Sequence, residues 1–199
     1  LYISATKLSG ADALDPRPWL ALATIDRRAG DAAAARLWLE TLRDRCGAAG
    51  VLIAGLRNKT AVGNTPSPVM VDALLKTEFN LALLDIERNQ TAAAEPRLRT
   101  LIALPAGIAG SDDALIRSLW HCALGDCLIA QNRTGDAIRE YRTAIRLDPL
   151  NAVAQRALGR AATDKAEALD SLRRAAEIRA GDTGMQREQI GRASCRERV

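Results

Sequence analysis

The sequence predicts an all-α fold built from successive helix–turn–helix pairs. Alanine makes up roughly a fifth of the 199 residues, and aromatic residues only 3%. This composition favours short, closely packed helices over sheets, because alanine has the highest helix propensity and lacks the branched side chain that strands favour. A pair of small residues 12 positions apart also recurs along the chain, at Ala23 and Ala35, Ala82 and Ala94, and Gly125 and Ala137.

The most regular copy of this pattern covers residues 118–151. It reads Leu124-Gly125-x-x-Leu128, then Ala137-x-x-x-Tyr141-x-x-Ala144, then Leu147-Asp148-Pro149. Small residues at Gly125 and Ala137 let two helices cross closely, since larger side chains would push their axes beyond the usual ~8–10 Å. Asn132 lies where the first helix ends, and asparagine tolerates the left-handed conformation of a helix end. Thr134 or Asp136 can cap the second helix, which Pro149 stops.

This copy resembles the tetratricopeptide repeat, a helix–turn–helix unit of about 34 residues. The resemblance implies neighbouring copies, because one unit cannot bury its apolar face alone. It therefore implies a right-handed α-α superhelix of about four repeats. His121 departs from the family at its first signature aromatic position, and Trp120 beside it can fill that space. An ordinary helical hairpin is the alternative, since it also spaces leucine and alanine by three and four.

An upstream copy fits residues 16–49. It contains Trp19-x-x-Leu22-Ala23 and then Ala35-x-x-x-Leu39-x-x-Leu42. Asp15-Pro16 can supply a cap and a first-turn proline, Gly30 falls on the turn, and Asp31 can cap the second helix.

Two weaker copies complete the array. The copy at residues 75–108 has Asn89 on its turn, and Pro96 predicts that its second helix starts late or bends, because proline is tolerated only in the first turn of a helix. In the copy at residues 152–181, Gly159 and Ala168 are only nine positions apart. This shorter interval predicts a tight turn near Thr163-Asp164 and a shortened first helix.

The copies are unevenly spaced. Residues 1–15 can be the end of a preceding repeat, and residues 50–74 form an insert after the first copy. Glycine, asparagine, serine and proline in 63–68 predict a loop, whereas the apolar run 50–56 can be a helical turn or an extended segment. A surface insertion is favoured over a functional loop, because loops absorb extra length at little thermodynamic cost.

The last ten residues are expected to be foreign to the protein. Ile190–Val199 resembles the translation of a common sequencing-library adapter, so we exclude it from fold reasoning. On this hypothesis the natural chain continues beyond Gln189. Because the chain starts at Leu1 rather than methionine, we expect the natural N terminus to be missing as well, and both a cytoplasmic and a periplasmic location stay open.

Charge and composition argue against several other functions. Three arginines and one glutamate of the expected foreign tail supply two of the four net positive charges. The remaining charge does not support binding to nucleic acid. No apolar stretch approaches the ~20 residues of a membrane span. The sequence therefore predicts neither a nucleic-acid partner nor a membrane-spanning segment in this chain.

The sequence carries no motif for catalysis, a metal or a cofactor. His121 is the only histidine, and it cannot act with Cys122, because adjacent helix residues point about 100° apart. Without the tail, Cys46, Cys122 and Cys127 remain, an odd count that favours buried small hydrophobes over a disulfide framework or metal site. We therefore predict a protein that is not an enzyme and has no small-molecule substrate.

The resemblance implies a concave groove lined mainly by the first helices. The same offsets predict as its lining Arg27, Arg28, Phe79, Leu83, Ile86, Cys122, Asp126, Ile129, Arg156 and Arg160. Such a surface suits a peptide with some acidic character; alternatively, these residues pack against inserts or missing repeats. The predicted function is a scaffold that binds a protein or peptide. The alternative is the repeat region of a larger enzyme or of an envelope or polysaccharide-export component, for example one linked to a glycosyltransferase.

Overall fold

A computed structural model describes residues 16–45, 68–105 and 113–196. The described residues form α-helices and the short turns within each run of described chain, which confirms the predicted all-α class. The chain divides into two compact units, Leu1–Asp113 and Ala114–Val199. The predicted terminal segment 1–15 and most of the predicted insert, residues 50–67, lie outside the described part.

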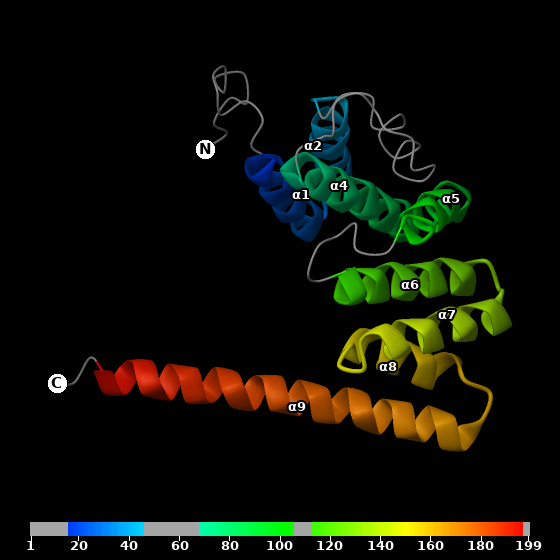
Figure 1. Cartoon of the computed structure of the whole chain (residues 1–199), viewed down its shortest axis with the longest axis vertical. Coiled ribbons are helices and arrows are strands. Elements are labelled where there is room, and N and C mark those ends of the chain that lie inside the picture. Colours follow the sequence, from blue (N-terminus) through cyan, green and yellow to red (C-terminus); the bar gives the residue numbers. More distant parts are fainter. Residues whose placement is uncertain (1–15, 46–67, 106–112, 197–199) are drawn as a thin grey trace. The chain divides into compact units, whose positions relative to one another are not determined.

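The first unit contains two helix pairs (Figure 1). Helices α1 (Arg17–Ala29) and α2 (Ala32–Arg45) form one pair, and α4 (Pro68–Glu87) and α5 (Thr91–Ile102) form the other. A buried cluster joins α1, α2 and α4, and it consists of Ala23, Ala35, Leu39, Leu81 and Leu84. This cluster buries the apolar faces that a single pair would leave in water.

The second unit contains two further pairs. Helices α6 (Asp113–Ala130) and α7 (Thr134–Leu147) form one, and α8 (Ala152–Ala161) and α9 (Lys165–Arg196) form the other. Asn151 ties the two pairs together. Its side chain accepts a hydrogen bond from Ala154 N at 3.0 Å, which caps α8, and donates to Ser118 Oγ at 2.9 Å. Ser118 in turn donates to the carbonyl of Ala144 at 2.8 Å.

The second helices share one register. Each begins three residues before the small residue that the sequence pattern singles out: α2 before Ala35, α5 before Ala94, α7 before Ala137 and α9 before Ala168. The first three of these alanines are fully buried. The second helices of the four pairs therefore begin at the same point of the sequence pattern.

The predicted turn residues adopt the left-handed conformation. The φ angle is +86° at Gly30, +58° at Asn89 and +62° at Asn132. The residue after each of them donates a backbone hydrogen bond to a carbonyl five residues back, as Arg133 N does to Leu128 O at 2.9 Å. This arrangement satisfies carbonyls that the helix end leaves free.

The fourth pair has the predicted short first helix and tight turn. Helix α8 has 10 residues, against 13 in α1 and 18 in α6. Its turn uses no left-handed residue: Ala162 is extended, and Asp164 Oδ1 accepts from Ala166 N at 3.1 Å at the start of α9.

The start of α4 differs from the prediction. The helix begins at Pro68, not near residue 75, so residues 68–74 belong to the helix and not to the insert. Burial explains the difference, since Ala73, Leu74 and Leu75 are at most 3% exposed. A proline is also compatible with the first position of a helix.

Helix α5 does not start late at Pro96. It starts at Thr91, so Pro96 is its sixth residue. Pro96 cannot donate to the carbonyl of Ala92, and both residues are exposed. Water can therefore bond that carbonyl, which makes the proline tolerable at this position.

Two of the predicted helix caps are also wrong. Arg133 occupies the cap position of α7, without a side-chain cap hydrogen bond. Asp136 instead pairs with Arg133 at 2.7 Å and with Arg139. At α1 the cap position is taken by Pro16, while Asp15 lies outside the described residues. Asp31 does cap α2, accepting from Ala34 N at 2.9 Å.

Helix α9 continues through Arg196, into the segment that the sequence assigns to a foreign tail. Nothing in the described helices is both long enough and apolar enough to span a membrane.

Candidate protein-binding surface

One side of α6 carries a stripe of residues at spacings of three and four. Leu115, Leu119 and Ile129 on this stripe are 50%, 46% and 39% exposed. Val153 on α8 is 49% exposed, and its own helix face also carries Arg156 and Arg160. We call this surface the α6–α8 face, defined as Leu115, Leu119, Asp126, Ile129, Val153, Arg156 and Arg160.

The structure brings the polar members of the α6–α8 face together. Tyr141 on α7 donates from its hydroxyl to Asp126 Oδ1 at 2.7 Å. Asp126 is exposed on one side, yet partial desolvation raises the pKa of its carboxyl. The hydrogen bond from Tyr141 and the charge of Arg156 both lower this pKa. Burial and the nearby Asp126 raise the pKa of Tyr141, so the phenol remains a donor. Arg156 thus acts electrostatically on the Asp126 carboxyl, and we call these two residues the acceptor–donor centre.

Cys122 lies beneath this face rather than on its open surface. Its side chain is buried, at 4% exposure. Burial raises the pKa of the Cys122 thiol to about 12, with Asp126 adding to the effect and Arg156 opposing it. Cys127 is buried as well. Both cysteines therefore pack as small hydrophobes, as the sequence predicts.

His121 is engaged elsewhere. Its Nδ1 lies 2.7 Å from Glu140 Oε2 on α7, and Trp120 beside it is 1% exposed. Within the described part of the chain, no group of three histidine, cysteine or acidic side chains could hold a metal ion.

The predicted groove residues of the first unit lie on α1 and α4. Arg27 pairs with Glu87 at 3.3 Å, which joins the ends of the two helices. Arg28 is exposed, and Phe79, Leu83 and Ile86 are half-buried along one side of α4.

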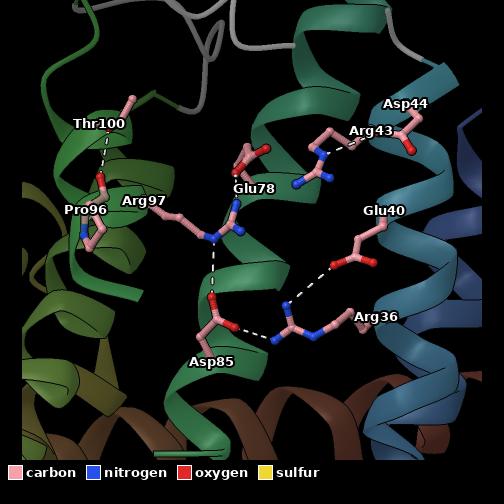
Figure 2. Close-up of polar contacts among 9 residues, drawn as sticks. All are labelled: Arg36, Glu40, Arg43, Asp44, Glu78, Asp85, Pro96, Arg97 and Thr100. Carbon is pink, nitrogen blue, oxygen red and sulfur yellow. Dashed lines mark hydrogen bonds and ion pairs between the residues drawn. The ribbon is translucent and has the colours of Figure 1, made fainter. Parts of the chain in front are cut away.

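The first unit also contains a buried charge cluster that the sequence analysis missed. Asp85 on α4 is 1% exposed. It accepts hydrogen bonds from Arg36 on α2 and from Arg97 on α5, the second at 3.2 Å (Figure 2). Arg97 also donates to Glu78 at 2.7 Å. This cluster links α2, α4 and α5. Its members are too far apart in sequence for a spacing pattern to indicate them.

Sequence spacing could have found part of the α6–α8 face. Leu115 and Leu119 precede the predicted Cys122 by seven and three residues and so lie on the same helix side. Val153 precedes the predicted Arg156 by three in the same way.

This chain is similar to one protein family and to several solved structures. Residues 118–151 match the family model "Tetratricopeptide repeat". Among solved structures, "MamA RS-1 ArsTM double mutant" is 16% identical, with coverage of 84% of this chain and 96% of that one and a TM-score of 0.45. "Crystal structure of MamA protein" is 16% identical, with coverage of 86% and 96% and a TM-score of 0.43. "MamA AMB-1 C2221" is 18% identical, with coverage of 83% and 99% and a TM-score of 0.40. No curated protein sequence matches significantly.

Paired helices in a common register define a helical-repeat protein, a class that serves as scaffolds for protein–protein interaction. Residues 118–151 match the family model, so this part of the chain is a tetratricopeptide repeat.

Proposed function

We propose that this chain is a non-enzymatic scaffold that binds a peptide segment of a protein partner on the α6–α8 face. The observation that carries the proposal is the exposure of Leu115, Leu119 and Ile129 along the side of α6 that also carries Asp126, with Val153 exposed on α8. Exposed apolar side chains that cluster in this way, with polar groups among them, are typical of interaction surfaces.

The chemistry of the centre favours a peptide ligand. Arg156 and Arg160 offer guanidinium groups, which bond carboxylates and backbone carbonyls. Asp126 keeps acceptor capacity for a peptide N–H, because Tyr141 occupies only one of its oxygens. We expect the ligand to place apolar side chains against α6 and an acidic side chain against the two arginines.

The proposal includes the predicted lining of the first unit. Arg28 is exposed, and Phe79, Leu83 and Ile86 are partly so, and these residues would form a separate surface of the first unit for a peptide. Two features support binding without catalysis: the Cys122 thiol is protonated at neutral pH because its pKa is about 12, and His121 is engaged by Glu140.

Selection from a random peptide display library tests the proposal. Peptides selected on the parent chain should lose at least tenfold in affinity on Leu119→Glu or Arg156→Glu. They should bind Leu169→Glu as they bind the parent, since Leu169 lies on α9 outside the face and is 73% exposed. Equal affinity for the parent and both face variants would refute the proposed surface.

A further inference from the structure

A second candidate site lies on a recurring pair of positions in the repeats. One position of each pair lies four residues before the small residue of the first helix. The other lies three residues after the alanine of the second helix. In the first three repeats the two side chains contact each other: Trp19 and Trp38 with ring centroids 5.5 Å apart, Glu78 and Arg97 at 2.7 Å, and His121 and Glu140 at 2.7 Å.

The fourth pair is different. Its members are Gln155 on α8 and Ser171 on α9, which are 3% and 5% exposed. Both side chains are uncharged, and neither makes a hydrogen bond to another described residue. They instead line a cleft of about 600 Å³ between α7, α8 and α9. This volume lies in the range of small-molecule sites, about 300–1,000 Å³.

The equivalent place in the second repeat is smaller. A cavity of about 350 Å³ there is lined by Glu78, Pro96, Arg97 and Thr100, which correspond in register to Gln155, Asp170, Ser171 and Arg174 of the larger cleft. In the second repeat the Arg97 guanidinium occupies this place and bonds the chain's own carboxylates. In the fourth repeat the corresponding residue is Ser171, which leaves the space open.

The rim of the larger cleft is basic. Four arginines line it: Arg139, Arg142, Arg146 and Arg174. Arg142 is held by Glu167 at 2.8 Å, Arg174 by Asp170 at 3.0 Å, and Arg139 by Asp136. Arg146 donates to the neutral Thr143 hydroxyl at 2.9 Å, and no carboxylate among the described residues pairs with it. The cleft therefore offers an uncompensated guanidinium above two buried polar side chains and the apolar Leu158.

We propose that this cleft binds a small organic anion through its carboxylate or phosphate group. Arg146 bonds the anionic group, and Gln155 and Ser171 bond polar atoms of the remainder. The ligand takes the place that the Glu78–Arg97 pair fills in the second repeat. This site is independent of the α6–α8 face, and it adds a ligand to a chain for which the sequence predicted no small-molecule substrate.

Titration of the full chain with citrate, and separately with inorganic pyrophosphate, tests the proposal by calorimetry and by NMR of the arginine Nε–H and glutamine side-chain amide signals. We expect saturable binding that shifts the Arg146 and Gln155 signals and weakens with added salt. A response to citrate alone identifies a carboxylate ligand, and a response to pyrophosphate alone a phosphate ligand. Absence of saturable binding in both titrations would overturn the proposal.

Two variants and a matched control locate the site. Arg146→Gln should weaken binding at least tenfold, whereas Arg88→Gln, which removes the same charge from an exposed turn of the first unit, should leave it unchanged. The double variant Gln155→Glu with Ser171→Arg recreates the Glu78–Arg97 pair and should abolish binding while circular dichroism remains that of the parent. Equal losses of affinity in Arg146→Gln and Arg88→Gln would contradict the proposal. This comparison of two single variants remains a complete test if the double variant does not fold.

Discussion

Gly125 and the ring of Tyr141 are in direct contact where α6 crosses α7. A β-carbon placed on Gly125 would lie 2.4 Å from Tyr141 Cε1, closer than real β-carbons approach other atoms. The ring cannot swing aside freely, because Tyr141 is 2% exposed and its hydroxyl bonds Asp126. The absence of a side chain at position 125 is therefore what allows these two helices to pack.

Replacement of Gly125 by leucine should lower the free energy of unfolding by about 1–3 kcal/mol or more, as overpacked helix contacts do. Urea denaturation followed by circular dichroism measures the change. Gly135→Ala is the control: a β-carbon there meets nothing within 4 Å, so stability should stay the same or rise slightly. A Gly125→Leu variant as stable as the parent would be incompatible with this helix crossing.

Removal of the Asp85 charge should weaken the contacts that hold α2, α4 and α5 together. In Asp85→Asn the two arginines lose a buried ionised acceptor, and we expect the free energy of unfolding to fall by about 1.5–3 kcal/mol, the range for hydrogen bonds to charged groups. Asp72→Asn is the matched control, because Asp72 pairs with Lys76 on the exposed side of α4 and exposed pairs contribute little. Similar losses of unfolding free energy in the two variants would show that the buried cluster stabilises the fold no more than an exposed pair does.

The Arg142–Glu167 pair should make stability depend on acid pH. Hydrogen bonding to Arg142 holds the pKa of Glu167 below its ordinary value. A carboxyl whose pKa is lowered by folding stabilises the protein above its unfolded pKa, near 4.3, and this stabilisation is lost as the pH falls through the folded pKa. Thermal melts from pH 7 to pH 3 should therefore show a smaller decrease in melting temperature for Glu167→Gln than for the parent. Identical pH profiles would exclude a contribution from this pair.

The thiols of Cys122 and Cys127 should resist alkylation in the folded protein. Burial keeps both from reagents, and the pKa of Cys122, about 12, leaves little thiolate at pH 8. Iodoacetamide treatment followed by peptide mass spectrometry should find both unmodified without denaturant and modified in urea. Rapid native labelling of Cys122 would mean that α6 is not packed as described.

Local chemistry explains which features of the fold could be predicted. The turns at Gly30, Asn89 and Asn132 follow from one backbone requirement, a positive φ, that few residue types meet. The short α8 follows from the shortened interval before Ala168.

Features that depend on tertiary contacts could not be predicted in the same way. A proline signals both a loop and a helix start, and only the burial of residues 73–75 shows which applies at Pro68. Asp136 could cap α7 or pair with arginines, and in the structure it pairs with Arg133 and Arg139. The cleft at Gln155 and Ser171 needs three helices in place before it exists, so no local pattern indicates it.

Site-specific photo-cross-linking tests most directly whether the α6–α8 face binds a protein. A photoreactive phenylalanine analogue is placed at Leu119 or at Leu169, in cells that express the chain, and cross-linked proteins are identified by mass spectrometry. Our account predicts a discrete partner cross-linked from position 119 and not from position 169, and loss of that product when Arg156→Glu is added. The same products from both positions, or products from position 169 alone, would contradict it.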